Sequence, residues 1–337
     1  MPRSRRSVPA LIDVARKAGV GAGTVSRVIN GGHNVSAKTL AVVRAAIQEL
    51  GYVPSHAART LKGARTKTIG LIVPSVANPF FSSAADAIQK VASAHGCLVL
   101  LAASENDPSK EKELVTTFIQ RRIDGLIFVP SDAAHVDILE NAGFPAVCFD
   151  QPINGGSIAT VLADNYGGAR IATEHLVAHG YRRILCIGED PKLFTSQERF
   201  RAHRDVISAA GLPYLFEPNV RDFASAEAAV IAHLNCPKPI DAVFSTKNST
   251  TLYVYYILRK LGCRIPDSVA LIGYDDFQLA DALEPAISVI RQPVQEIATR
   301  AAKMLFQQMG RVNRHQDSVI VNVQLITRAS CGALGTC

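Results

Sequence analysis

A segment near the start of the chain carries side chains that can hydrogen-bond to DNA. Thr24, Ser26 and Arg27 follow closely behind two small residues, Ala22 and Gly23. Arginine can bind the O6 and N7 atoms of guanine with two hydrogen bonds, and hydroxyl groups can hold phosphates or base edges. These side chains act together only if one short helix presents them, so the surrounding segments should be helical.

The residues around this group have the spacing of two short helices joined by a turn. Leu11, Val14, Ala15 and Ala18 lie three or four positions apart and therefore share one helix face, which Gly19 ends. A second apolar set follows at 25, 28 and 29, as in a helix-turn-helix motif whose second helix enters the major groove. A plain helical hairpin is the alternative. The predicted DNA contacts in this segment are Ala22, Gly23, Thr24, Ser26, Arg27 and Asn30.

A third helix is expected directly after this motif. Ser36 is a suitable N-cap, and Gly51 and Pro54 end the helix. The apolar positions 40, 43, 47 and 50 form its buried face. The three helices can therefore share one small core.

The positive charge of the chain is confined to its first fifth. Residues 1–67 contain 12 Lys and Arg but only two acids, Asp13 and Glu49, a net charge of +10, whereas residues 68–337 carry 24 basic and 27 acidic residues, a net charge of −3. Basic charge confined to a predicted helix-turn-helix segment is typical of phosphate binding. Membrane attraction is the rival explanation. However, the sequence has no apolar run of membrane-spanning length and no signal peptide, so we expect a cytoplasmic protein.

Several enzyme and cofactor signatures are missing from the sequence. The segment GVGAGT at 19–24 imitates a nucleotide-binding loop, but Thr24 occupies the last glycine position and a helix precedes it. The seven cysteines form no CxxC pair and no metal-type cluster with histidine. No nucleophile elbow or Walker loop is present. We therefore expect no enzyme activity, no metal, no disulfide and no cofactor.

From Thr68 onward the sequence predicts an α/β fold. Short apolar runs rich in β-branched residues alternate with amphipathic stretches, as parallel sheets with helical crossovers require. The expected strands are roughly 68–73, 97–102, 124–129, 145–149, 158–163, 183–188, 240–245 and 269–273. The expected helices are roughly 80–95, 108–121, 135–142, 165–179, 196–210, 225–234, 248–261 and 295–309.

Ligands of open parallel sheets bind at the carboxyl ends of the strands, and polar residues stand at these places in the sequence. They are Asn78-Pro79-Phe80-Phe81, Ser131-Asp132, Thr246-Lys247-Asn248 and Gly273-Tyr274-Asp275-Asp276, with Arg199 on a following helix. Each also has a structural explanation, since Asn-Pro favours a turn and the aspartates can cap a helix.

Several motifs occur together in one order. They are DVARKAGV, TVSRVIN, VSAKT, AIQELGYVP, AARTLK, TKTIGLIVP and NPFF. In this order and with these gaps, the sequence resembles the lactose-repressor (LacI/GalR) family of bacterial transcription regulators, as far as about residue 328.

The resemblance implies a division of the chain into three parts. An all-α helix-turn-helix DNA-binding domain spans 1–54, a hinge helix and linker 55–67, and an effector-binding and dimerisation core 68–337. The core is expected to contain two doubly wound parallel-sheet subdomains of periplasmic-binding-protein type. The N-subdomain would comprise about 68–164 and 293–316, and the C-subdomain about 165–292 and 317–330, with crossovers near 164, 292 and 317.

The segment SHAARTLKG at 55–63 is too short to be a stable helix alone. In the family this segment forms a hinge helix when two subunits meet on DNA, and a leucine inserts between base steps in the minor groove. The resemblance assigns DNA contacts here to Ala58, Leu61 and Lys62. An ordinary linker is the alternative reading.

The resemblance also implies an effector site between the subdomains. The residues expected there are Asn78, Phe80, Phe81, Ser131, Arg199, Lys247 and Asp275. Three positions depart from the family pattern: Ala10 and Gly21 replace hydroxyl residues, and Lys247-Asn248 replaces the usual Asn-Asp. If Lys247 faces the cleft beside Arg199, two cations would favour an anionic effector such as a sugar acid or sugar phosphate. Alternatively, Lys247 pairs with Asp275 or Asp276, or points to solvent.

These features together predict a homodimeric transcription regulator, acting as a repressor. It would bind pseudo-palindromic operator DNA and respond to a small, sugar-like effector, which would be anionic if Lys247 faces the cleft. The competing hypothesis of a solute-binding protein explains the α/β core but requires export. An enzyme would need catalytic motifs that the sequence lacks.

Overall fold

The computed structural model of the chain describes residues 9–29, 31, 34–53, 65–131, 136–153, 158–310 and 318–332. The chain divides into two compact units, Met1–Thr66 and Lys67–Cys337. Each unit has a hydrophobic core of its own.

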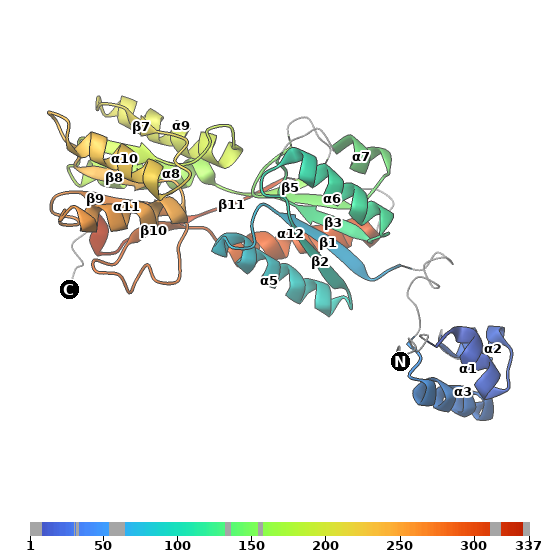
Figure 1. The fold of residues 1–337 in the computed structure, drawn as a ribbon. Helices are drawn as coiled ribbons and strands as arrows, with labels where there is room; N and C mark the ends of the chain where they lie inside the picture. Colours follow the sequence, from blue (N-terminus) through green and yellow to red (C-terminus); the bar gives the residue numbers. More distant parts are fainter. Residues whose placement is uncertain are drawn as a thin grey trace, which may run out of the picture. The chain divides into compact units, whose positions relative to one another are not determined.

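The first unit contains the three predicted helices, drawn in blue in Figure 1. They are α1 (Leu11–Ala18), α2 (Ala22–Ile29) and α3 (Ala37–Leu50). Val14, Val25 and Val43 are buried together at their centre. Gly19 and Gly51 end α1 and α3 in the left-handed conformation, at φ +64° and +59°, which glycine adopts without steric cost. The predicted helix-turn-helix pair and third helix are confirmed.

The second unit contains two six-stranded sheets. The strand order of the first sheet is β11 (Val319–Val321), β5 (Ala159–Ala163), β4 (Ala146–Phe149), β3 (Gly125–Phe128), β1 (Thr68–Val73) and β2 (Leu98–Ala103). The order of the second sheet is β12 (Gln324–Ile326), β10 (Ser288–Arg291), β9 (Ala270–Tyr274), β8 (Ala242–Ser245), β6 (Ile184–Ile187) and β7 (Leu215–Glu217). All neighbouring strands are parallel except β10 and β12.

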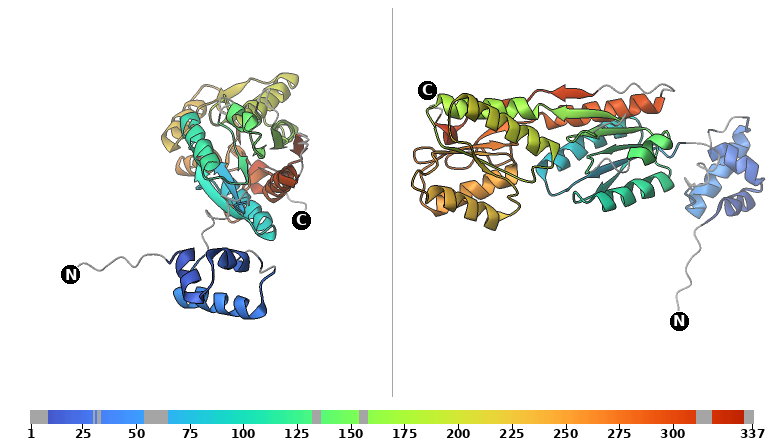
Figure 2. Two further views of the ribbon diagram at one scale, coloured as in Figure 1. Left: turned by 90° about the vertical axis from the view of Figure 1, so that its right-hand side faces the viewer. Right: turned by 90° about the horizontal axis from the view of Figure 1, so that it is seen from above.

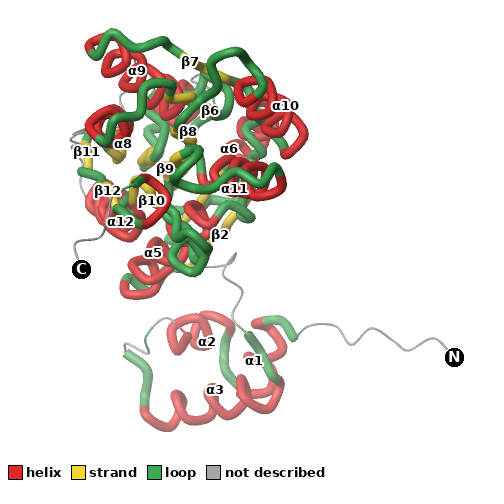
Figure 3. The backbone as a smooth tube through the Cα atoms, turned by 90° about the vertical axis from the view of Figure 1, so that its left-hand side faces the viewer, coloured by secondary structure: helices red, strands yellow, loops and turns green. Residues whose placement is uncertain are grey.

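Helices cover both faces of each sheet, so the central strands are buried on both sides. On the first sheet, α5 (Pro79–Ala94) packs with α12 (Val294–Gly310), while α6 (Pro108–Gln120) and α7 (Val136–Asn141) lie on the opposite face (Figure 1). On the second sheet, α8 (Asn165–Ala178) packs with α9 (Phe194–Ala209), and α10 (Phe223–Leu234) packs with α11 (Asn248–Lys260) on the other face (Figure 3). A short 3-10 helix, η1 (Ala329–Cys331), follows β12.

Local sequence explains where several of these helices begin. The side chain of Asn78 accepts a hydrogen bond from the Phe80 N–H, and Pro79 occupies the first helical position of α5. Asp107 caps α6 in the same way, again followed by proline. The capping residues stand directly after strands or short loops, so each helix starts close to the carboxyl end of a strand.

The two lobes of this unit are joined by three connections (Figure 2). The first follows β5 near Asp164, and the second follows β10 near Gln292, as predicted. The prediction that the third lies near 317 is wrong, because β11 pairs with β5 in the first sheet, with Val319 opposite Val161. The chain therefore crosses between β11 and β12, at residues 322–323.

Candidate functional site

The exposed face of α2 carries the residues that were predicted to read DNA. Val25 and Val28 point into the core of the first unit, which leaves Gly23 and Arg27 exposed. Ala22, Thr24 and Ser26 are half-buried on the flanks of the same helix. Asn30, Ala58, Leu61 and Lys62, which were also predicted to contact DNA, lie outside the described residues.

Ala10 and Gly21, which replace the hydroxyl residues usual in the family, cannot cap their helices with a side chain. The Asp13 carboxylate holds the start of α1 instead, and a backbone carbonyl holds the start of α2. The N–H of Ala10 donates to the Asp13 carboxylate at 2.9 Å, and no side chain of residue 10 caps α1. The carbonyl of Gly21 accepts hydrogen bonds from the N–H groups of Thr24 and Val25 at the start of α2. The acids of this unit are themselves paired, Asp13 with Arg16 at 3.5 Å and Glu49 with Lys17, so they do not oppose the positive charge elsewhere on its surface.

In the second unit, a cavity of about 500 Å³ lies where strand ends of both sheets meet. A cavity of this size suits a small-molecule ligand. Its wall combines segments that follow β1, β2, β4, β6, β8 and β9 with the start of α9 and the second connection. Of the predicted effector residues, the wall contains Asn78, Phe80, Phe81, Arg199, Lys247 and Asp275.

The part of the wall contributed by the first sheet is aromatic. The rings of Phe80 and Phe81 meet edge to face with their centroids 5.1 Å apart, and Phe81 contacts Phe149 in the same manner. Opposite them, the Asn248 side chain donates to the Asn78 side chain at 3.2 Å. Asn78 belongs to the first lobe and Asn248 to the second, so a direct hydrogen bond joins the two lobes at the cavity wall.

Arg199 is buried in the wall and held from three sides. Its Nε donates to Asn165 at 2.9 Å, its Nη1 donates to the Thr246 carbonyl at 2.7 Å, and its guanidinium lies 3.6 Å from the centroid of the Tyr274 ring. These contacts leave the arginine little freedom to move. It can therefore present a fixed cation to the cavity.

Asp275 follows β9 in a conformation that few non-glycine residues adopt. Its φ is +70°, and its buried carboxylate accepts a hydrogen bond from Gln292 Nε2 at 2.5 Å. The Oε1 atom of Gln292 is buried and has no hydrogen-bond partner among the described residues. Gln292, which the sequence analysis did not single out, thus offers a free acceptor in the cavity wall.

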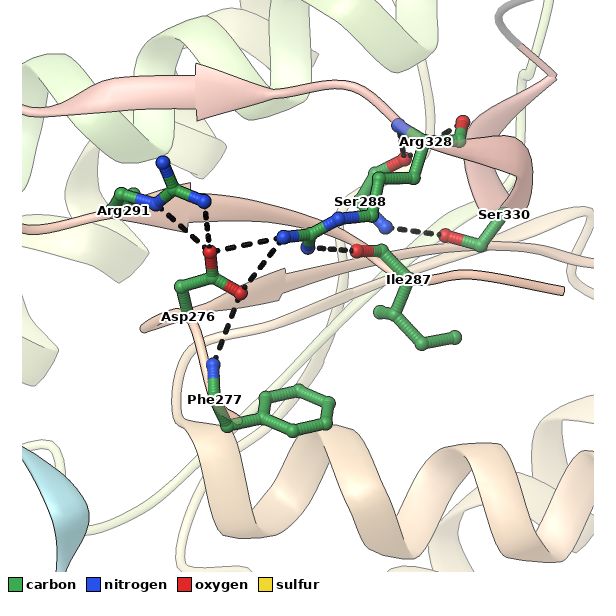
Figure 4. A network of polar contacts seen from close by, with 7 residues as sticks. All are labelled: Asp276, Phe277, Ile287, Ser288, Arg291, Arg328 and Ser330. Atoms are coloured by element: carbon green, nitrogen blue, oxygen red, sulfur yellow. Dashed lines mark hydrogen bonds and ion pairs between the residues drawn. The ribbon is translucent and has the colours of Figure 1, made fainter. Parts of the chain in front are cut away.

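The next residue, Asp276, belongs to a separate polar network (Figure 4). Its carboxylate accepts hydrogen bonds from Arg291 at 2.6 Å and from Arg328 at 3.0 Å. Arg328 also donates to the carbonyl of Ile287. Burial would raise the pKa of Asp276, but hydrogen bonds from Arg328 and Arg291 hold it below its usual value. Asp276 therefore links Arg291, which precedes the second connection, to Arg328, which follows the third.

Asp150, another residue that the sequence analysis did not single out, faces the same cavity. It follows β4 with φ +66°, just as Asp275 follows β9 in the other sheet. Burial raises the pKa of Asp150 to about 6; the charge of Arg199 partly offsets this rise, and that of Asp275 adds to it. The strand-end rule that selected Asp275 would have selected Asp150 as well.

Lys247 lies on the cavity wall, but its charge is not free. Its Nζ forms an ion pair with Glu189, which follows β6. The premise of two unpaired cations in the cavity is therefore wrong, and so is the alternative of a pair with Asp275 or Asp276. The missed partner, Glu189, stands directly after the predicted strand at 183–188.

Ser131 is not among the residues of the cavity wall. Its N–H and hydroxyl both donate to the carboxylate of Glu111, which is buried at the start of α6. The prediction of Ser131 as an effector contact has no support, because the serine is engaged in anchoring a helix to the end of β3.

Other classes of site receive no support from the described part of the chain. There, no group of three His, Cys, Asp or Glu has the arrangement of a metal site, and no helix is long and apolar enough to cross a membrane. Cys97, Cys148 and Cys186 are buried in the core, as small apolar side chains would be.

The arrangement of these parts agrees with known proteins. Residues 10–55 match the model of the bacterial regulatory proteins of the lacI family, and residues 173–331 match that of a periplasmic binding protein-like domain. The HTH-type transcriptional regulator CelR of Thermobifida fusca is 33% identical over an alignment of 338 residues. That alignment covers 97% of this chain and 99% of CelR. A solved CelR–cellobiose complex has a TM-score of 0.72 and 31% identity, covering 96% of this chain and 99% of the other.

The lac repressor dimer bound to operator and the anti-inducer ONPF matches with a TM-score of 0.84 and 25% identity, again over 96% of this chain and 99% of the other. A helix-turn-helix unit that matches the lacI-family model, a two-lobed core with a cavity and full-length likeness to regulators thus occur in one chain. The chain belongs to the lacI family of bacterial regulatory proteins, which are DNA-binding transcription regulators and not enzymes.

Proposed function

We propose that the protein is a homodimeric repressor whose affinity for operator DNA is switched by a sugar-like effector in the cavity of its core. In this proposal residues 1–54 bind DNA, residues 55–67 form the hinge, and residues 68–337 bind the effector and the second subunit. The two lobes of the core divide at the connections near 164, 292 and 322, which differs from the sequence-based boundary only at the last of these.

The DNA-binding role is supported by the surface of α2. Gly23 and Arg27 are exposed there, with Ala22, Thr24 and Ser26 beside them. Arg27 is assigned a guanine contact, since it is the side chain of the exposed face that can make a bidentate bond to a base. Ala22 and Gly23 offer no side-chain donors, so readout at these positions relies on close backbone approach and methyl contact.

One observation carries the effector role: residues of both lobes line a single cavity. Phe80 and Asp150 come from the first lobe, whereas Arg199 and Asp275 come from the second. A ligand that contacts both sets stabilises one relative position of the lobes over others. Such a ligand shifts a conformational equilibrium only by the difference in its affinity for the two states.

The charges of the cavity favour a neutral polyhydroxyl ligand. Its ionisable residues are two cations, Arg199 and Lys247, and four acids, Glu105, Asp150, Glu189 and Asp275. An anion placed there would lie near four carboxylates and only two cations, which is costly in a buried site. Hydroxyl groups can donate to the carboxylates and to Gln292 Oε1 while they accept from Arg199. The CelR relative was solved with cellobiose, a neutral sugar.

The dimer is supported by an apolar edge on the first sheet. Strand β2 is an edge strand, and Leu98, Leu100 and Leu101 on it are exposed to 67%, 38% and 46%. An edge strand with exposed leucines is prone to association unless another surface covers it. A second copy of the chain provides that cover in the proposed dimer, and the similar lac repressor was solved as a dimer.

A solute-binding protein without a DNA role is the second hypothesis. It accounts for the two-lobed core and the cavity. It leaves the helix-turn-helix unit and its confined positive charge without a purpose, so the family match at residues 10–55 favours the repressor.

Two measurements test the proposal. A thermal-shift screen of the full chain against neutral, acidic, phosphorylated and amino sugars should show stabilisation by a neutral sugar, because a ligand that binds the folded state raises the melting temperature. In vitro selection from random duplex DNA should recover a pseudo-palindromic site. A protein stabilised by sugars but unable to select any duplex sequence would support the solute-binding hypothesis instead.

A further inference from the structure

Lys247 and Glu189 meet because their strands are neighbours in the second sheet. Strands β6 and β8 pair in parallel, with Ile187 opposite Ser245. Glu189 stands two residues after Ile187, and Lys247 stands two residues after Ser245. The register of the sheet therefore places the two side chains at equivalent positions beyond the strand ends, on the wall of the cavity.

A glycine lets the two loops approach closely. A Cβ atom added to Gly188 would lie 1.8 Å from Oγ1 of Thr246, far inside any allowed contact. The Thr246 N–H donates to the carbonyl of Ile187 at 2.9 Å, which fixes this close approach. The close approach of the two loop backbones thus positions Lys247 and Glu189 next to each other.

The pair is partly shielded from water. The side chains of Lys247 and Glu189 are only 26% and 28% exposed. Of the other acids of the cavity, Glu105 pairs with Lys110 at 2.6 Å, Asp275 accepts from Gln292, and Asp150 interacts more strongly with Arg199 than with Lys247. Glu189 is therefore the acid that neutralises Lys247.

We infer that Glu189 determines which charge class of effector the cavity accepts, because its carboxylate occupies the ammonium group with which an acidic or phosphorylated sugar would otherwise pair. The inference rests on the proposed role of the cavity as the effector site. With Glu189 in place, an anionic group near Lys247 must break the ion pair and lie beside a carboxylate. Without the carboxylate, Lys247 is a free cation in a partly desolvated wall and can form charge-assisted hydrogen bonds to an anion.

The opposite substitution should have the opposite effect. If Lys247 is replaced by glutamine, Glu189 loses its cation and the wall gains a free negative charge. A protonated amine on the ligand would then find a partner that the unaltered protein does not offer. If both residues are replaced by glutamine, the wall regains its original net charge and the original preference should return.

The experiment uses the full-length protein and the variants Glu189→Gln, Lys247→Gln and Glu189→Gln/Lys247→Gln. The matched control is Glu227→Gln, since Glu227 forms a similar pair with Lys260 at 2.8 Å, is 30% exposed, and lies on α10 outside the cavity wall. Each protein is tested by thermal shift and titration calorimetry against matched ligands. The panel contains glucose, gluconate, glucuronate, glucose 6-phosphate and glucosamine, the galactose series and cellobiose.

We expect the original protein and the Glu227→Gln control to be stabilised by a neutral sugar and not by its acidic or phosphorylated form. The Glu189→Gln variant should gain affinity for an acidic or phosphorylated member by about tenfold or more, the usual weight of a hydrogen bond to a charged group. The Lys247→Gln variant should instead gain affinity for the amino sugar. Circular dichroism spectra that match the original protein show that the variants are folded.

Two results would overturn the inference while the proposed function stands. One is stabilisation of the original protein by an acidic sugar; the other is a neutral sugar that binds while Glu189→Gln gains no anionic ligand. If no sugar stabilises the original protein or any variant, the proposed effector site and this inference both fail.

Discussion

At the scale of single residues, the raised pKa of Asp150 can be measured. Asp150 comes from the first lobe and lies on the cavity wall with Arg199, which comes from the second. Burial raises the pKa of Asp150 from 3.8 to about 6. A carboxyl group with a raised folded-state pKa binds its proton more tightly in the folded protein than in the unfolded chain.

Asp150 should therefore make the protein less stable as the pH rises. Between pH 3.8 and about 6 the folded state holds more protons than the unfolded state at this group, so the free energy of unfolding falls with increasing pH and stays lowered above pH 6. The variant Asp150→Asn has no such titration. Above pH 6.5 it should be more stable than the original protein by about 2–3 kcal/mol, a gain that shrinks toward pH 4.

Urea unfolding at several pH values checks this prediction. Subtracting the free energy of unfolding of one protein from that of the other at each pH cancels the titration of all other groups. Curves of stability against pH that run parallel for the two proteins would show that Asp150 titrates normally in the folded state.

Arg27 offers a second residue-scale prediction, on the DNA side. Arg27→Ala should cost about 1–3 kcal/mol for the selected operator and relax the preference for guanine at one position of each half-site. Arg16→Ala is the matched control, since Arg16 is exposed in the same unit but pairs with Asp13. Operator affinities measured by fluorescence anisotropy with single-base operator variants distinguish a guanine contact from a phosphate contact. An equal loss on every sequence would make Arg27 a phosphate contact.

At the scale of secondary-structure elements, the loops after β6 and β8 depend on Gly188. Gly188→Ala would force its Cβ against Thr246, at a distance of 1.8 Å unless the loops separate. The expected cost is about 1–3 kcal/mol of stability, together with weaker sugar binding, because overpacking shifts the backbone that carries Lys247 and Glu189.

Gly310→Ala is the control for this prediction. Gly310 ends α12, and no atom lies within 4 Å of the position its Cβ would occupy. Its replacement should leave stability unchanged or slightly raised. Thermal unfolding of both variants makes the comparison, and equal stability of the two would show that the β6 and β8 loops tolerate separation.

How far the sequence predicts these elements depends on the range of the forces involved. Helices and central strands follow from local periodicity, so β1, β3, β6, β8 and β9 were found close to their observed bounds. Strands β7, β11 and β12 have only three residues each, and β10 has four; they are held by pairing with neighbours rather than by their own pattern. For that reason the third connection was misplaced.

The same limit applies to the site. The rule that ligands bind at strand ends selected Asp275 and Lys247, and the family resemblance added Arg199; all three lie on the cavity wall. It also selected Ser131, whose contact with Glu111 depends on a helix 20 residues earlier. The partnership of Lys247 with Glu189 depends on the adjacency of β6 and β8, which is a property of the assembled sheet.

At the scale of the whole molecule, the exposed edge of β2 should hold two subunits together. Replacing Leu98 and Leu101 by glutamate places charges on that edge and should convert the dimer to a monomer, because charged edge strands resist pairing. Ile320→Glu is the control, since Ile320 is 66% exposed on β11, the opposite edge of the same sheet. Sedimentation equilibrium checks the result, and a dimer that survives the double substitution would place the interface elsewhere.

The central claim is that the cavity and the DNA-binding unit are coupled. The most direct test is the affinity of the full-length protein for its selected operator, measured by fluorescence anisotropy with and without the sugar that raises its melting temperature. We predict a change of about 5–150-fold, and by linkage the operator should change the affinity for the sugar by the same factor. Equal operator affinity with and without saturating sugar would contradict the account.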